Sequence, residues 1–498
     1  MATADQYDAF IEHVQRLTNV GTASQVLSWD QQVMMPAGGT PARSQQLSTL
    51  SSIHHELLTS DETATALDEL DRGTLDDEQM AVVREIERQY DRAASVDRSL
   101  VEAISQTTSE ALPEWEQAKN NDDFNAFAPT LERIVELKRE YAAQIDPDAD
   151  PYAVLFAEYE PYLDLETTTR ILDRLRDRLV ELIDAIEARG ATIETNAFEG
   201  SYPVDEQATV CHDLLDTLGY PFEHGRLDTA PHPFSTGTQF DARVTTRYNE
   251  SAPLEAITST IHEFGHATYT LGLPRERYGT PLGQSRNLSV HESQSRLWEN
   301  HVGRSKTFWE NVLPVVAETF PTASDLPIQD VYETINQVYP DNTIRVEADE
   351  LTYHLHIILR FEIEKALVRG EIEVEEIPQL WNEKMESYLG VRPQTDAEGC
   401  LQDIHWTHGN FGYFPTYSLG SVLAAQLFAS ATAEIDGLDE QLRAGEFDAL
   451  HEWLTDAVHQ HGQRYTTPEL IEVATGEPFT ADYFLEYVEE KYSELYEL

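Results

Sequence analysis

The stretch 253–272, PLEAITSTIHEFGHATYTLG, contains the pentapeptide HEFGH at 262–266. Four residues are slightly more than one helical turn, so His262 and His266 would lie one above the other on the same helix face. Two imidazoles in that arrangement can bind one zinc ion. Glu263, next to them, could accept a proton from a water that such a metal activates. The pattern has this meaning only if the stretch is helical.

The flanking residues predict that helix. Ser251 is a candidate N-cap, Pro253 suits the first helical turn, and apolar residues recur at helical spacing from there to Leu271. Gly272 and the proline that follows shortly after would end it. The competing interpretation is an ordinary helix that happens to contain two histidines. The otherwise apolar surroundings favour a metal site.

A peptidase zinc site needs a third protein ligand and leaves one position for water. No histidine follows at position 272, so the extended HEXXHXXGXXH pattern is absent. Glu292, in SVHESQSRLWEN and 26 residues after His266, lies on a predicted second helix that returns after a Pro- and Gly-containing loop. His291 is the alternative, but it points about 100° away from Glu292 around that helix. We predict Glu292 as the third ligand.

The composition indicates a folded, strongly acidic protein. The chain has 498 residues, 34 Lys and Arg, 90 Asp and Glu and a formal charge of −56, yet 41% of its residues are hydrophobic. That fraction is too high for a disordered acidic chain. The acids are spread over the whole length, so we expect an acidic surface adapted to a high-salt interior. Binding of cations or basic partners is the alternative, and nucleic acid is a poor partner for such a surface.

Two cysteines, Cys211 and Cys400, do not make a disulfide framework. The first residues show no basic-then-apolar signal pattern, and no apolar run approaches the length of a membrane span. We therefore expect a soluble, cytoplasmic protein without a membrane partner.

Most of the chain is predicted to be helical. Amphipathic patterns cover 60–145, 166–190, 345–370 and 464–498, and a strand pattern occurs only at 236–248. No repeat is visible. The chemically informative motifs spread from 232 to 417, so we expect residues 1–498 to form one catalytic unit. Its predicted fold is mainly α, with two helical lobes around one cleft and a small β-ribbon near it.

Two motifs lie in and before the predicted ribbon. His232, in HPFS, precedes a proline and is therefore held on an extended backbone, where it could bind substrate or be an ordinary loop histidine. In DARVT, Asp241, Arg243 and Thr245 alternate and would share one strand face. They could hydrogen-bond along a bound peptide. A structural salt bridge between Asp241 and Arg243 fits the pattern equally well.

Arg345 begins a third motif, in IRVEADELTYHLHIILRFEIEKAL at 344–367. We expect it to open a strongly apolar helix, where a guanidinium is costly unless it is paired. Arginine binds a carboxylate through two parallel hydrogen bonds, so Arg345 is a candidate for a substrate carboxylate. His354 and His356 are two residues apart, cannot face one metal, and are predicted to be packing residues.

The fourth motif is GCLQDIHWTHGNFGYFPTYSLG at 399–420. Its Gly, Asn, Pro and aromatic residues predict an ordered loop rather than a helix. His405, Tyr413 and Tyr417 could donate hydrogen bonds that stabilise an oxyanion in the transition state.

In order along the chain, HPF, DARVT, HEFGH, HESQS, IRVEAD and GCLQDIHW resemble the motifs of the M32 metallocarboxypeptidases, the carboxypeptidase Taq family. The segment LSWDQQVMMPAGGTPARSQQLSTLS at 27–51 also resembles that family's opening segment. The resemblance implies a gluzincin-like helical peptidase that forms homodimers and uses Zn²⁺ or Co²⁺. It would remove single residues from peptide C-termini with broad specificity, usually not a C-terminal proline.

Carried over residue by residue, the resemblance implies roles for the motif residues. It makes His262, His266 and Glu292 the metal ligands and Glu263 the general base. Arg345, with Arg243 as a second candidate, would bind the terminal carboxylate of the substrate. His405 and either Tyr413 or Tyr417 would assist the transition state.

Two other functions are compatible with HEFGH. An oligopeptidase or dipeptidyl carboxypeptidase could use the same metal site. A non-enzymatic helical protein could instead hold a structural metal and recruit partners through its acidic surface. Glu263 argues against the second, because a structural site has no use for a base.

Overall fold

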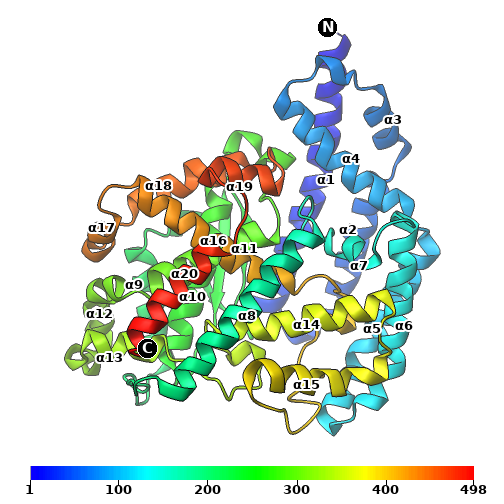
Figure 1. The fold of residues 1–498 in the computed structure, drawn as a ribbon. Helices are drawn as coiled ribbons and strands as arrows, with labels where there is room; N and C mark the ends of the chain where they lie inside the picture. The colour runs from blue at the N-terminus through cyan, green and yellow to red at the C-terminus, as the bar shows by residue number, and fades with distance from the viewer. Residues whose placement is uncertain (1) are drawn as a thin grey trace.

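Helices dominate the chain, and one small three-stranded sheet accompanies them (Figure 1). The computed structural model describes residues 2–498. The predicted mainly α fold class is confirmed. In the described residues, no helix combines the length and apolar character needed to cross a membrane.

The helices and strands have the following bounds. In the first half they are α1 Ala2–Val33, α2 Thr40–Leu58, α3 Asp61–Glu69, α4 Asp77–Ser95, α5 Arg98–Asn121, α6 Phe124–Ile145, α7 Pro151–Phe156, α8 Leu165–Arg189, α9 Val204–Thr217, β1 Leu227–Thr229, β2 Ser235–Thr238 and β3 Asp241–Thr246. In the second half they are α10 Pro253–Gly272, α11 Leu288–Arg296, α12 Lys306–Thr319, α13 Ile328–Ile335, α14 Thr352–Arg369, α15 Ile377–Leu389, α16 Pro415–Glu434, α17 Leu438–Ala444, α18 Asp448–Ala457, α19 Thr467–Thr475 and α20 Asp482–Leu495.

Helix α16 joins two large hydrophobic cores. Leu419 and Val422 belong to the core formed with α5–α8, α14, α15 and α20, whereas Leu423 and Leu427 belong to the core formed with α9, α10, α12 and the sheet. A helix that is apolar all round must be buried on every side. The two cores are therefore connected through α16. The N-terminal helices α1–α4, drawn in blue, extend away from them at the top right of Figure 1.

The sheet has the strand order β1-β3-β2. Strand β2 pairs antiparallel with β3, as the predicted ribbon requires, and β1 pairs parallel with β3. Strand β1 was not predicted, because three residues are too few to show an alternating pattern. Ala242 and Val244 of β3 are fully buried and lie in the same core as α10. The sheet thereby supports the helix that carries HEFGH.

Helix α10 starts and ends as predicted, but its N-cap differs. Pro253 is the first helical residue and Gly272 the last. Ala252 is the N-cap, with no side-chain cap. Ser251 instead bonds to the Asn249 side chain, 2.9 Å from Ser251 Oγ to Asn249 Oδ1, so the prediction that Ser251 caps the helix was wrong.

The motifs around Arg345 and His405 also differ from the predicted elements. Arg345 lies in the short 3-10 helix η8, Arg345–Glu347, and α14 begins only at Thr352. The reason is Asp349, whose Oδ1 accepts from the backbone nitrogens of Leu351 and Thr352 at 2.8 and 3.0 Å and so starts the helix there.

The predicted loop at 399–420 is only partly a loop. A 3-10 helix, η10, covers His405–His408, and α16 begins at Pro415, which places Tyr417 in its first turn. Proline at that position is compatible with a helix start, so the proline that suggested a loop in fact begins the central helix.

Two glycines allow α10, α11 and α16 to pack in direct contact. A Cβ atom on Gly265 of α10 would lie 2.5 Å from the carbonyl oxygen of Gln294 and 2.6 Å from Cα of Ser295, both on α11. A Cβ atom on Gly420 of α16 would lie 2.4 Å from Cγ of Glu292. Helix α11 is thus held between two helices at distances that only glycine permits.

We expect Gly265→Ala to destabilise the protein by about 1–3 kcal/mol, the usual cost of overpacking, because the methyl group would meet backbone atoms that cannot rotate away. It should also weaken metal binding by separating α10 from α11. Chemical denaturation and metal titration measure the two effects. Gly38→Ala is the control, because a Cβ atom there meets nothing within 4 Å. Equal stability of both variants would contradict the packing argument.

Candidate metal centre

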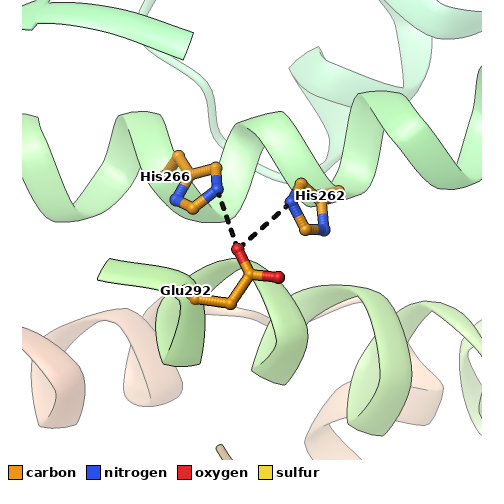
Figure 2. Close-up of side chains that lie close together, drawn as sticks. All are labelled: His262, His266 and Glu292. Atoms are coloured by element: carbon orange, nitrogen blue, oxygen red, sulfur yellow. Dashed lines mark ion pairs between the residues drawn. The ribbon is translucent and has the colours of Figure 1, made fainter. Parts of the chain in front are cut away.

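Helices α10 and α11 bring His262, His266 and Glu292 together (Figure 2). Oε2 of Glu292 lies 3.7 Å from Nε2 of His262 and 3.4 Å from Nε2 of His266. One donor atom from each residue lies within 4.8 Å of the other two. Donors bound at 2.0–2.1 Å to a tetrahedral ion are roughly 3.4 Å apart, so the three atoms fit one ion and leave one coordination position.

His291 lies behind this group rather than in it. Its Nδ1 is 2.6 Å from Nδ1 of His266, the ring nitrogen that faces away from Glu292. Burial lowers the pKa of His291 to about 3, which keeps its ring neutral. A neutral His291 can accept the Nδ1–H of His266 and leave Nε2 of His266 free for a metal. In the described residues, no other group of three such side chains could share an ion.

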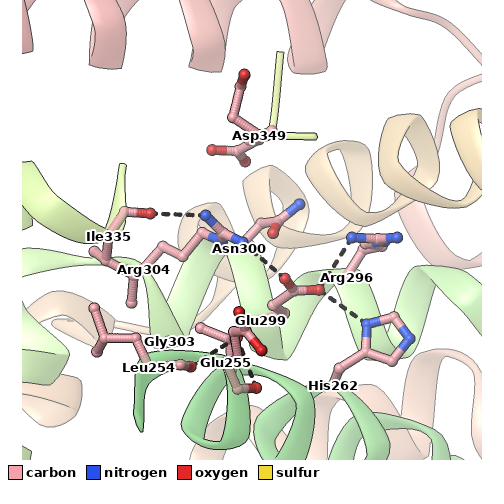
Figure 3. A network of polar contacts seen from close by, with 12 residues as sticks. Leu254, Glu255, His262, Arg296, Glu299, Asn300, Gly303, Arg304, Ile335 and Asp349 are labelled. Atoms are coloured by element: carbon pink, nitrogen blue, oxygen red, sulfur yellow. Dashed lines mark hydrogen bonds and ion pairs between the residues drawn. The ribbon is translucent and has the colours of Figure 1, made fainter. Parts of the chain in front are cut away.

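Glu299 orients the other histidine (Figure 3). Its Oε2 lies 2.9 Å from Nδ1 of His262. Arg296 and Arg304 donate to the same carboxylate at 3.1 and 3.0 Å. Burial alone would raise the pKa of Glu299, but Arg296, His262 and Arg304 hold it well below its usual range. Glu299 is therefore a carboxylate that fixes the imidazole of His262 from behind, a common arrangement at metal sites.

Glu299 lies in a π-helical segment, η6, Leu297–Gly303, which continues α11. Such segments are rare and frequent at functional sites. Glu292, Arg296 and Glu299 follow one another along this continuous helix. One helical surface therefore carries the candidate third ligand and the carboxylate that orients His262.

The charge of Glu292 is strongly stabilised. Nε of Arg296 donates to its Oε1 at 2.7 Å. Burial would raise the pKa of Glu292, but Arg296 and the two histidines outweigh it and hold the pKa far below its usual range. An ionised carboxylate is the form that binds a metal.

Glu263 has the opposite electrostatic environment. It is 5% exposed, and its Oε2 has no hydrogen-bond partner in the described residues. Burial raises the pKa of Glu263, and the neighbouring charges of Glu292 and Glu299 raise it further, against the effect of the histidines. A carboxylate with a raised pKa accepts protons more readily near neutral pH. The two glutamates are thus separated into an ionised ligand and a candidate base.

Arg345 is buried and already paired. Its Nε and Nη2 donate to Oδ1 of Asp403 at 3.0 and 2.8 Å. Its Nη1 lies 3.4 Å from the hydroxyl of Tyr353. The Tyr353 ring lies 6.0 Å from the Arg345 guanidinium and 5.0 Å from that of Arg296. Arg296 is hydrogen-bonded to Glu292. Tyr353 therefore connects Arg345 with the metal group, by which we mean His262, His266 and Glu292.

Asp403 is shared by two arginines. Nε of Arg360 donates to Oδ2 of Asp403 at 2.6 Å. Arg360 is 0% exposed, and its Nη2 has no partner in the described residues. Two guanidinium groups against one carboxylate leave an excess positive charge next to Arg345, a favourable environment for a further carboxylate.

His405, Tyr413 and Tyr417 lie next to each other beside Arg345. The hydroxyl of Tyr417 is 3.5 Å from Nε2 of His405, and the Tyr413 and Tyr417 rings are 5.3 Å apart. The Arg345 guanidinium is 5.5 Å from the Tyr417 ring. Burial lowers the pKa of His405 to about 4, so the ring is neutral near pH 7. The three residues could donate hydrogen bonds near the metal group.

Arg243 and His232 have other surroundings. Arg243 donates to Asp241, 2.6 Å from Nη2 to Oδ2, and its guanidinium lies 4.1 Å from the centre of the Trp29 ring. The salt bridge considered from the sequence is therefore present. His232 is exposed in the segment before β2. His354 and His356, expected to be packing residues, are both buried.

Several residues of this region were not identified from the sequence. Glu299 could have been found, since it follows Glu292 by seven residues on a predicted helix. Asp403 stands in the QDIHW motif, but nothing local indicates its partners. Tyr353 and Arg360 sit in an apolar segment, and their contacts with Arg345 arise only from the packing of distant elements.

The family model described as carboxypeptidase Taq (M32) metallopeptidase matches residues 9–492. Thermostable carboxypeptidase 1 of Thermus thermophilus is 38% identical over 504 residues, covering 98% of this chain and 99% of that protein. Carboxypeptidase 1 of Bacillus subtilis is 36% identical over 491 residues and covers 98% of each chain.

Solved structures are similar over the same length. The M32 carboxypeptidase of Deinococcus radiodurans R1 has a TM-score of 0.96 and 36% identity, covering 99% of this chain and 100% of that one. A Pyrococcus furiosus carboxypeptidase has a TM-score of 0.94 and 37% identity, covering 98% of this chain and 99% of that one.

We expect Glu299→Gln to weaken metal binding about 10- to 100-fold, the usual effect of losing such a supporting carboxylate, because a neutral amide holds His262 less firmly. Competition with a chromogenic chelator measures the affinity. Glu310→Gln, at an exposed glutamate paired with Arg443, is the control. Unchanged affinity in the Glu299 variant would show that His262 needs no support.

Proposed function

The chain belongs to the carboxypeptidase Taq (M32) family of metallopeptidases, and on this basis we propose how its own residues release single C-terminal residues from peptides. It is a metal-dependent carboxypeptidase, a hydrolase of peptide bonds. We propose that residues 1–498 act as one catalytic unit with broad specificity. The observation that carries the proposal is the group of three donors next to buried Glu263, whose Oε2 has no hydrogen-bond partner among the described residues.

His262, His266 and Glu292 would hold the metal. Two imidazoles and one carboxylate suit zinc, and cobalt is compatible with the same donors. When bound, such an ion supplies Lewis-acid activation of a water molecule and of the scissile carbonyl. Glu299 and His291 would hold the two ligand rings in place, as the contacts of their side chains indicate.

Glu263 would be the general base. Its carboxylate takes a proton from the attacking water and then transfers that proton to the leaving amine nitrogen. Burial, which raises its pKa, supports this role. Hydrogen bonds from the hydroxyls of Tyr413 or Tyr417 and from the neutral ring of His405 would stabilise the oxyanion of the transition state.

Arg345 would bind the terminal carboxylate of the substrate. The excess positive charge that Arg345 and Arg360 share around Asp403 supports this role. Only a chain end carries such a carboxylate, so a fixed arginine near the metal group favours release of the last residue. Arg243 remains a second candidate, weakened by its pairing with Asp241. His232 remains a candidate contact for substrate.

The finer properties rest on the composition and the family resemblance. We propose a salt-adapted protein, because a formal charge of −56 repels itself unless ions screen it. Loss of stability on raising the KCl concentration would contradict this.

We also propose a cytoplasmic homodimer. Its buried free cysteines, Cys211 and Cys400, fit a reducing compartment, and light scattering measures the oligomeric state.

We expect Glu263→Gln to retain metal and lose hydrolysis, by a factor of roughly 10²–10⁴, because the amide cannot accept the proton. Blocked peptides with a free C-terminus, followed by mass spectrometry with and without a chelator, measure the release of residues. Ladders of single residues that disappear with the chelator fit the proposal. Dipeptide or internal fragments would indicate a dipeptidyl carboxypeptidase or oligopeptidase, and full activity of the metal-loaded variant would remove Glu263 from the mechanism.

We expect Arg345→Ala to raise KM for free-acid peptides at least about 30-fold, which corresponds to roughly 2 kcal/mol for a lost buried charge pair. The preference for a free acid over the matched C-terminal amide should fall with it. Arg243→Ala is the matched variant, since it removes the other candidate. A larger effect there would transfer the role to Arg243.

A further inference from the structure

Arg88 and Arg286 line a cavity of about 320 Å³ beside His291, together with the acidic residues Glu85 and Glu158. With three neighbouring basic side chains the two arginines form one group. We call it the basic cluster: Arg84, Arg88, Arg92, Lys138 and Arg286. Three of its members, Arg84, Arg88 and Arg286, lie 5.5, 5.9 and 5.3 Å from the ring of Tyr162. In a chain with 34 basic and 90 acidic residues, such a concentration of cations is unusual.

Two acidic side chains pair with this cluster. Glu85 binds Arg286 at 2.8 Å and Arg84 at 2.9 Å. Glu158 lies 3.4 Å from Nζ of Lys138 and 3.7 Å from Arg92. These two carboxylates account for the ion pairs of Arg84, Arg92, Lys138 and Arg286, and leave Arg88 outside them.

A third carboxyl group, Glu160, does not change this balance. It is fully buried, and burial raises its pKa to about 8 against the hydrogen bonds from Ser289 and Asn287. Near neutral pH the group is therefore largely protonated and contributes little negative charge. The cluster keeps its excess of positive charge.

Arg88 carries that excess. Among the side chains of residues 6–498 no acidic group lies within ion-pair distance of its guanidinium, which donates to the carbonyl of Ala157. Its charge is disfavoured by partial burial and by Arg92. Arg88 also lines the cavity. A half-buried, unpaired guanidinium at a cavity wall is a site for an anionic group.

The cavity adjoins the metal centre through His266. His291, which contacts His266, lines it, as does Tyr159, whose ring lies edge-on to Tyr413 at 5.1 Å. Arg345, by contrast, connects to the metal group through Tyr353 and Arg296. The two arginine sites therefore approach the metal group through different side chains.

We propose that this cavity is a subsite for an acidic side chain of the peptide substrate, and that Arg88 pairs with its carboxylate. The proposal rests on the proposed function, in which Arg345 holds the terminal carboxylate. Release of single residues leaves only one residue beyond the scissile bond. The side chain and the terminal carboxylate of that last residue share one Cα atom, whereas the cavity and Arg345 approach the metal group through different side chains. We therefore assign the acidic side chain to a residue upstream of the scissile bond.

The test uses blocked peptides of one sequence in which each of the four residues before the scissile bond is in turn Glu or Gln. We expect the wild type to show a kcat/KM about 10-fold higher for Glu than for Gln at one of these positions, since a partly buried charge pair contributes about that much. Salt should reduce the ratio. In Arg88→Met the ratio should fall to about one, with the Gln peptides cleaved as before.

Two further variants separate charge from structure. Arg88→Lys keeps the charge and should keep a preference for Glu, whereas Arg88→Glu should favour Lys at the same position. Arg72→Met is the matched control, because Arg72 is exposed and paired with Glu87. It should leave every ratio unchanged.

Three results would overturn the subsite. They are a wild type without any Glu preference, an Arg88→Met variant that keeps the preference, and an equal loss on Glu and Gln peptides. If Arg88→Met loses activity equally on Glu and Gln peptides and also no longer prefers a free C-terminal acid to the matched amide, Arg88 rather than Arg345 binds the terminal carboxylate. Failure of the wild type to release any C-terminal residue would instead reject the proposed function itself.

Discussion

The close packing of α11 between α10 and α16 is the constraint on which the site depends. Gly265 and Gly420 remove the two side chains that would separate these helices. Glu292 then lies opposite His262 and His266, and the continuation of the same helix brings Glu299 behind His262. Because close contacts between the helices set these positions, the packing of the protein itself arranges the donors, which is a general requirement of precise sites.

Around this packing, the chain separates charges by function. Arginines hold Glu292 and Glu299 ionised, whereas burial raises the pKa of Glu263, which is next to His262 in the chain. The same principle operates at Asp403, where one carboxylate serves two arginines. The presence or absence of an oppositely charged side chain within a few ångströms thus sets the pKa of each group, and with it whether the group is ionised.

The helical fold class, the bounds of α10 and the β2–β3 hairpin could be predicted from the sequence, since periodicity and spacing are local properties. The proximity of His262, His266 and Glu292 could also be predicted. The two histidines are four residues apart on one helix face, and Glu292 lies on the next helix. Tyr353, Arg360 and the role of Asp349 as a helix start were not. Their partners come from segments far away in the chain, and Pro415 misled because the same residue begins helices and interrupts them.

The shared aspartate has a consequence for how the enzyme balances folding against binding. Arg360 is buried without a full counter-charge, so the substrate-free protein retains an electrostatic penalty that a neutral pair would avoid. In the proposed binding mode, a carboxylate beside Arg345 would relieve that penalty, and part of its affinity would then originate in the destabilised state without substrate. Proteins commonly have such a lower stability at functional sites, and buried Arg360 beside the shared Asp403 is an example.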